Sequence, residues 1–172
     1  MFGTGELKVL EKATQIAEEV TTDHFSLSSR DWARSPFFVD TVSRTNRSIN
    51  CPQNVFAHLV YFGKDPGKKN FPRERNGYYK IFVNDPKIID WLKNRPGYGL
   101  LPLLTYVMTH ELVHIARFLR FHCHPLTNIK DKEEEVVHEL TYNILKPVKM
   151  DGLYPILEYF NNSERRFSHA NL

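Results

Sequence analysis

The chain has 172 residues, of which 41% are hydrophobic and 25% are charged. This is the composition of a globular protein, and it excludes a largely disordered chain. The length predicts a single domain over residues 1–172. A formal charge of +3 is too small to indicate a nucleic-acid partner, so we expect none.

The first residues lack the basic segment and the apolar run of a secretory signal. The apolar stretch around residues 100–108 is much shorter than a membrane span, and two cysteines cannot form a disulfide framework. We therefore expect a soluble, cytoplasmic protein with no membrane partner.

The sequence patterns predict an α+β fold. Hydrophobic residues at helical spacing predict helices, and runs of β-branched and aromatic residues predict strands. Two of these strands are joined by a turn-prone loop, so we expect a small antiparallel sheet. In chain order, the predicted elements are a helix at 6–20, a short strand at 37–42, strands at 55–62 and 78–83, and helices at 85–91, 102–121, 131–146 and 154–160.

The helix at 102–121 is apolar on nearly all sides, which indicates a buried position. It carries His110, Glu111 and His114. The two histidines are four residues apart, so their imidazoles lie on one face of the helix and can bind one zinc ion. Glu111 lies next to them, where a carboxylate can take a proton from water on the metal. Burying these side chains without a metal or a partner would be costly, which favours a zinc site over a chance match.

The residues themselves leave the third metal ligand open. A catalytic zinc has three protein ligands, and the helix at 131–146 offers several candidates. Steps of about 100° per residue put Glu134 on one edge of the buried face and Glu135 toward solvent. His138 lies slightly further round than Glu134, and Glu139 lies on the opposite edge. This geometry favours Glu134.

The motif and the following glutamate on a second helix resemble the gluzincin metallopeptidases, the thermolysin-like family. The resemblance covers residues of about 78–146, and the segment 1–50 is not assigned. It implies a zincin-like fold, with a buried motif helix beside a ligand helix, and a Zn²⁺ cofactor. It also implies a third ligand roughly twenty residues after the second histidine, which is the position of Glu134.

The same resemblance implies a carboxylate four residues beyond the ligand glutamate that orients a zinc histidine. With Glu135 as the ligand, Glu139 takes this position. With Glu134 as the ligand, His138 takes it, which departs from the family pattern. Glu134 and Glu135 therefore both remain candidate ligands, with His138 as a further alternative. Arg117, one turn beyond the histidines, is expected to pair with a carboxylate of the ligand helix or to stabilise an oxyanion.

Members of this family bind their peptide along an edge strand that precedes the motif helix. The resemblance implies that the strand at 78–83 has this role, with Tyr79, Ile81 and Val83 in contact with substrate by β-augmentation. A strand in the middle of the sheet is the alternative interpretation.

These patterns predict a zinc-dependent metallopeptidase that cleaves peptide or protein substrates with Glu111 as the general base. There are two alternatives. One is a zinc hydrolase that acts on non-peptide amides, and the other is a binding or regulatory module that retains a structural metal site.

Overall fold

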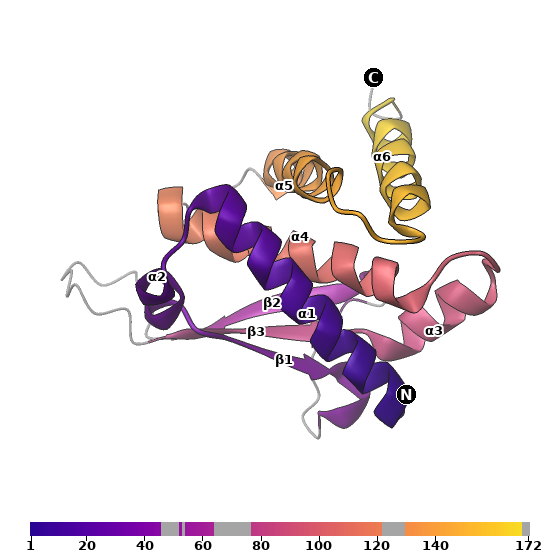
Figure 1. Ribbon diagram of the computed structural model, residues 1–172, viewed down its shortest axis with the longest axis horizontal. Helices are drawn as coiled ribbons and strands as arrows, with labels where there is room; N and C mark the ends of the chain where they lie inside the picture. Colours follow the sequence, from indigo (N-terminus) through magenta and orange to yellow (C-terminus); the bar gives the residue numbers. More distant parts are fainter. Residues whose placement is uncertain (46–51, 53, 64–76, 122–129, 170–172) are drawn as a thin grey trace.

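The fold is known from a computed structural model, which describes residues 1–45, 52, 54–63, 77–121 and 130–169. It has the predicted α+β character, and every predicted helix and strand is present (Figure 1). A short helix, α2, is additional. The elements are α1 (Thr4–Phe25), α2 (Ser29–Arg34), β1 (Phe37–Thr41), the single 3₁₀ turn η1 (Val42–Arg44), β2 (Ala57–Phe62), β3 (Tyr78–Val83), α3 (Asp85–Lys93), α4 (Leu100–Phe121), α5 (Lys130–Leu145) and α6 (Leu153–His169).

The three strands form one sheet in the order β1-β3-β2. As expected, β2 and β3 are antiparallel, but β1 pairs with β3 in parallel, so the sheet is mixed and the prediction of an antiparallel sheet is wrong in this respect. The sequence of β1 predicts a strand but not its direction, because the path of the connection decides how a strand pairs.

β3 lies in the middle of the sheet, so it cannot be the edge strand that was expected to bind substrate. Ile81 lies opposite Val39 on one side and Leu59 on the other, so both edges of β3 are paired. Its inward side chains are core residues: Tyr79 is 7% exposed, and Ile81 and Val83 are fully buried. The prediction that these three residues bind substrate is therefore wrong, because β-augmentation needs a free edge.

Helices α1, α4, α5 and α6 are stacked on one face of the sheet, while α2 and α3 lie near its ends (Figure 1). α1 and α4 lie over the strands, while α5 and α6 lie on the other side of α4. Ala13 and Ala17 of α1 are fully buried, and their small side chains allow α1 to pack closely along α4. The unassigned N-terminal segment thus supplies one of the helices that bury the motif helix.

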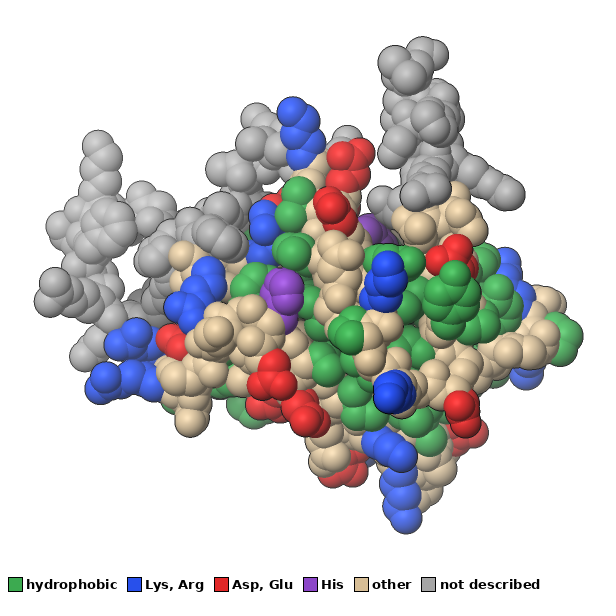
Figure 2. Space-filling view, turned by 45° about the horizontal axis from the view of Figure 1, so that its top comes forward, with side chains coloured by type: hydrophobic (Ala, Val, Ile, Leu, Met, Phe, Trp, Pro, Cys, Tyr) green, Lys and Arg blue, Asp and Glu red, His purple; other side chains and the backbone are tan. Residues whose placement is uncertain are grey.

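Charged side chains of both signs are spread over the face seen in Figure 2, and neither sign forms one continuous patch there. This agrees with the near balance of 23 Lys and Arg against 20 Asp and Glu. None of the described helices combines the length and the apolar character that crossing a membrane requires.

The close packing of α1 on α4 predicts a specific sensitivity to side-chain volume. Ala13→Leu should lower the free energy of unfolding by about 1–3 kcal/mol, because the added atoms overpack a filled interface. Gln15→Leu adds the same side chain at an exposed position of the same helix and should change stability by less than about 0.5 kcal/mol. Urea unfolding followed by circular dichroism measures both, and equal effects would contradict this packing.

Candidate metal centre

The motif residues are positioned by the buried helix α4. Burying the threonine hydroxyls of this helix costs little free energy, because each has a hydrogen bond. Thr105 Oγ1 donates to the Leu101 carbonyl at 2.8 Å, and Thr109 Oγ1 donates to the Thr105 carbonyl at 2.7 Å. With its threonines satisfied and most of its side chains in the core, α4 leaves one polar surface that faces α5. His110 and His114 lie one turn apart on this surface.

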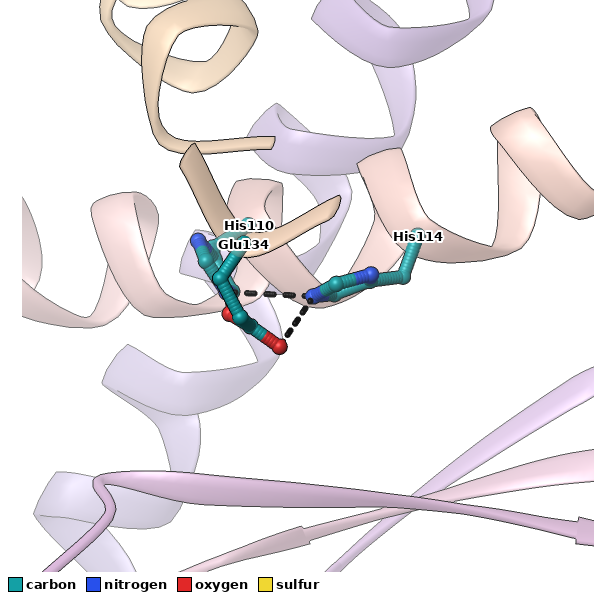
Figure 3. Close-up of side chains that lie close together, drawn as sticks. All are labelled: His110, His114 and Glu134. Atoms are coloured by element: carbon teal, nitrogen blue, oxygen red, sulfur yellow. Dashed lines mark hydrogen bonds and ion pairs between the residues drawn. The ribbon is translucent and has the colours of Figure 1, made fainter. Parts of the chain in front are cut away.

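Three side chains from two helices converge at this surface (Figure 3). His110 Nε2 and His114 Nε2 are 3.3 Å apart. Glu134 of α5 turns one carboxylate oxygen to each ring, at 3.3 Å from His110 Nε2 and 3.5 Å from His114 Nε2. Within the described residues, this is the one group of three or more His, Cys, Asp or Glu side chains whose donor atoms lie close enough to hold a metal ion.

The separations are short enough for the three side chains to share one metal ion. Zinc binds imidazole nitrogen and carboxylate oxygen at about 2.0–2.2 Å, so two ligands of a tetrahedral ion lie about 3.3–3.5 Å apart. The two imidazole nitrogens are 3.3 Å apart, and a different Glu134 oxygen lies near each of them, so that one donor atom from each residue lies within 4.8 Å of the others. The donor set of two imidazoles and one carboxylate is also one that zinc accepts, with a fourth position left over.

Glu111 is the buried carboxylate of the site, with 8% of its surface exposed. Burial raises its pKa, and Glu134 raises it further, while His110, His114 and His58 of β2 act in the opposite direction. A carboxylate that is held ready to take up a proton has the property that a general base needs.

Glu134 and His114 act on each other's charge. Burial alone would raise the pKa of Glu134, but hydrogen bonds from His110 and His114 hold that pKa well below its usual range. Burial alone would lower the pKa of His114, but the hydrogen bond to Glu134 and the nearby Glu111 carboxylate raise it. The site therefore attracts positive charge, which a proton or a cation can supply.

Arg117 holds the ligand helix against the motif helix. Its Nε and Nη2 donate to the two carboxylate oxygens of Glu133 at 2.7 and 2.9 Å. This is one of the two roles expected for Arg117, the pairing with a carboxylate of the ligand helix. Val113 and Val137, both fully buried, pack together further along the same interface. The contacts fix the position of α5 on α4 and hence that of Glu134, the next residue after Glu133.

The other candidates from the sequence do not belong to the group of converging atoms. Glu135 and Glu139 are exposed, and neither belongs to the group. The expected role of Glu139 in orienting a zinc histidine is therefore wrong for this arrangement, because the helix turns it to solvent. His138 does not belong to the group either, but its ring lies beside that of His110, with 4.4 Å between centroids.

Tyr106 is a residue of the site that the sequence patterns did not single out. Its hydroxyl lies 2.7 Å from His138 Nδ1. Burial and the neighbouring His110 lower the pKa of His138 to about 3. Tyr106 precedes His110 by one turn, which places it on the same face of α4. A tyrosine in so apolar a helix is usually interpreted as a core residue. Only its spacing of one turn from His110 indicates that it lies at the site.

Comparisons of the chain with protein-family models, with curated proteins and with solved structures found no match.

The electrostatics of His114 predict how stability depends on pH in metal-free protein. A histidine with a raised pKa contributes stability that is complete below its ordinary pKa of 6.5 and is lost as pH rises through the folded-state value. With a chelator present, the melting temperature should therefore fall between pH 6 and pH 8 more steeply in the wild type than in His114→Gln.

The control is His24→Gln, which removes an exposed histidine of α1 and should keep the wild-type dependence. Thermal melts at several pH values give the comparison. The same pH dependence in His114→Gln and in the wild type would contradict the pairing of His114 with Glu134.

Proposed function

We propose that this protein is a zinc-dependent hydrolase, in which His110, His114 and Glu134 hold the ion. The observation that carries the proposal is the convergence of one donor atom from each of these residues within 4.8 Å of one another, with the two imidazole nitrogens 3.3 Å apart, close to the separation of two ligands on a tetrahedral zinc. Three protein ligands leave one position for water, as in catalytic rather than structural zinc sites.

A bound zinc ion supplies a Lewis acid that polarises a carbonyl group and lowers the pKa of water to about 7. The proton transfers of the reaction are assigned to the buried carboxylate of Glu111. Its raised pKa suits it to accept a proton from the attacking water and to return that proton to the leaving amine. Because Glu111 follows His110 directly on α4, the base and the first ligand are positioned by the same helix.

A peptide substrate is favoured by the edge of the sheet that lies next to α4, which is formed by β2. Among the described strands, β2 pairs only with β3, so its other edge has backbone groups available for an extended peptide. β2 packs against α4, and its His58 is close enough to Glu111 to act on the pKa of that carboxylate. A peptide added along β2 would therefore run close to the proposed base.

The resemblance of the motif to the gluzincin metallopeptidases supports the same assignment. We propose that the buried helix α4 and the neighbouring α5 form a zincin-like core, with β2 in place of β3 as the strand that binds substrate. Glu134 is the third ligand in this proposal, ahead of Glu135 and His138.

Metal analysis of purified protein tests the site. We expect about one zinc per chain in the wild type and in Glu135→Gln, and its loss in His114→Ala and Glu134→Gln, because only the last two remove a donor atom of the group. Glu135→Gln is the matched control, since it changes the exposed neighbour of Glu134. A wild type that binds no zinc after zinc is supplied would disprove the proposal.

Glu111→Gln separates metal binding from hydrolysis. This variant should keep its zinc and lose hydrolytic rate by about 10²–10⁴-fold, because the amide cannot accept the proton of the attacking water. Zinc content and turnover are measured on the same preparation. If zinc is bound but neither protein hydrolyses any substrate, the structural-metal alternative is favoured.

The substrate class is tested with matched peptides and small amides. Unmodified peptides should be cleaved, and N-methylation of backbone groups near the scissile bond should slow cleavage, because it blocks hydrogen bonds to the edge of β2. Efficient hydrolysis of small non-peptide amides, with no reaction on peptides, would contradict the peptidase assignment and support the alternative amide hydrolase.

A further inference from the structure

A tyrosine–histidine pair lies directly beside the proposed metal ligands and has no part in the mechanism described so far. Tyr106 Oη and His138 Nδ1 are 2.7 Å apart, a short hydrogen bond. The His138 ring lies against the ring of His110, with the centroids 4.4 Å apart. The pair therefore links α4 and α5 at the edge of the metal centre.

His138 is chemically able to bind the same ion. It follows Glu134 by four residues on α5, just as His114 follows His110 on α4, so each helix carries two metal-binding side chains on one face. An imidazole is a ligand that zinc prefers, and a fourth protein ligand would close the position that water needs. The site can therefore be catalytic only if His138 does not bind the ion.

The hydrogen bond to Tyr106 can prevent His138 from binding the ion, because it fixes which ring nitrogen of His138 carries the hydrogen. A neutral imidazole has one N–H donor and one acceptor nitrogen. When the tyrosine hydroxyl donates to Nδ1, the ring hydrogen is on Nε2, and a protonated nitrogen cannot bind a metal. The ring is also held in place by the hydrogen bond, so it cannot turn freely toward the ion.

We propose that Tyr106 donates its hydroxyl hydrogen to His138 Nδ1 and thereby keeps His138 out of the metal's coordination shell, so that one position stays open for water. This inference rests on the proposed zinc site. Tyr106 is a positioning residue in it, because it acts through His138 and does not touch the reacting atoms.

The surroundings of Tyr106 support a fixed hydroxyl direction. Its ring is 3% exposed and stacks on Phe160 of α6 almost in parallel, with 4.1 Å between centroids and 3° between planes. This stacking holds the ring in one orientation and points the hydroxyl at His138. Among the described residues, His110 Nδ1 has no hydrogen-bond partner, and the His138 ring is the neighbouring ring on the α5 side, 4.4 Å away between centroids.

The tautomer is measured first, by two-bond ¹H–¹⁵N correlation spectra of metal-free protein. His138 should show its hydrogen on Nε2 in the wild type and should lose this preference in Tyr106→Phe, which keeps the ring and removes the hydroxyl. Tyr98→Phe, a half-buried tyrosine that packs against Trp91, is the matched control and should leave the His138 signals unchanged. A hydrogen on Nδ1 of His138 in the wild type would overturn the proposal.

The coordination shell is measured next, by X-ray absorption of the zinc protein and the visible spectrum of its Co²⁺ form. The zinc of the wild type should have two imidazole ligands and an open position. In Tyr106→Phe it should have three imidazole ligands, and in the double variant Tyr106→Phe/His138→Ala it should again have two. Hydrolysis should fall about 10–100-fold in Tyr106→Phe, as for other residues that act behind a metal ligand. Two imidazoles in Tyr106→Phe would overturn the proposal while leaving the zinc site intact.

His138→Ala alone keeps the test decisive if Tyr106→Phe does not fold. It should retain one zinc with two imidazoles, since His138 is not a ligand in the wild type. Loss of an imidazole from the shell would overturn the inference. A wild type without zinc would instead disprove the proposed function, and the tautomer spectra would still report on the pair.

Discussion

The position of α5 on α4 depends on the bidentate contact of Arg117 with Glu133. Both guanidinium hydrogen bonds are short, at 2.7 and 2.9 Å, and such a planar pairing allows little rotation. Val137 packs on Val113 further along the interface, so an apolar contact adds to the polar ones between the two helices. Glu134, next to Glu133, is thereby directed at the two histidines.

The charge balance of the site explains why a cation would stabilise it. Burial raises the pKa of Glu111, and the charge of Glu134 adds to this effect. In the metal-free protein a protonated His114, whose pKa is raised by Glu134 and Glu111, provides compensating charge. A divalent ion would supply that charge at all pH values where the imidazoles are neutral, so metal binding and the basicity of Glu111 are linked.

The N-terminal segment and the sheet contribute scaffold rather than chemistry. α1 uses buried alanines to lie close along α4, and the sheet covers the other side of the same helix. Because β1 pairs with one side of β3 and β2 with the other, the strand that was expected at the edge lies in the middle, and β1 and β2 are the edge strands. The pairing of the strands therefore determines which of them have an unpaired edge.

The sequence by itself determined the motif and all the helices except α2, and it put Glu134 at the edge of the buried face of α5 while leaving Glu135 open, because residues within one turn encode helical periodicity and the side-chain faces that follow from it. It did not determine the direction of β1 or the contacts of Tyr106. These depend on contacts between residues far apart in the chain, such as Tyr106 with His138 and Phe160. Only the tertiary structure decided them, because the packing of whole helices and the path of the connections bring such residues together.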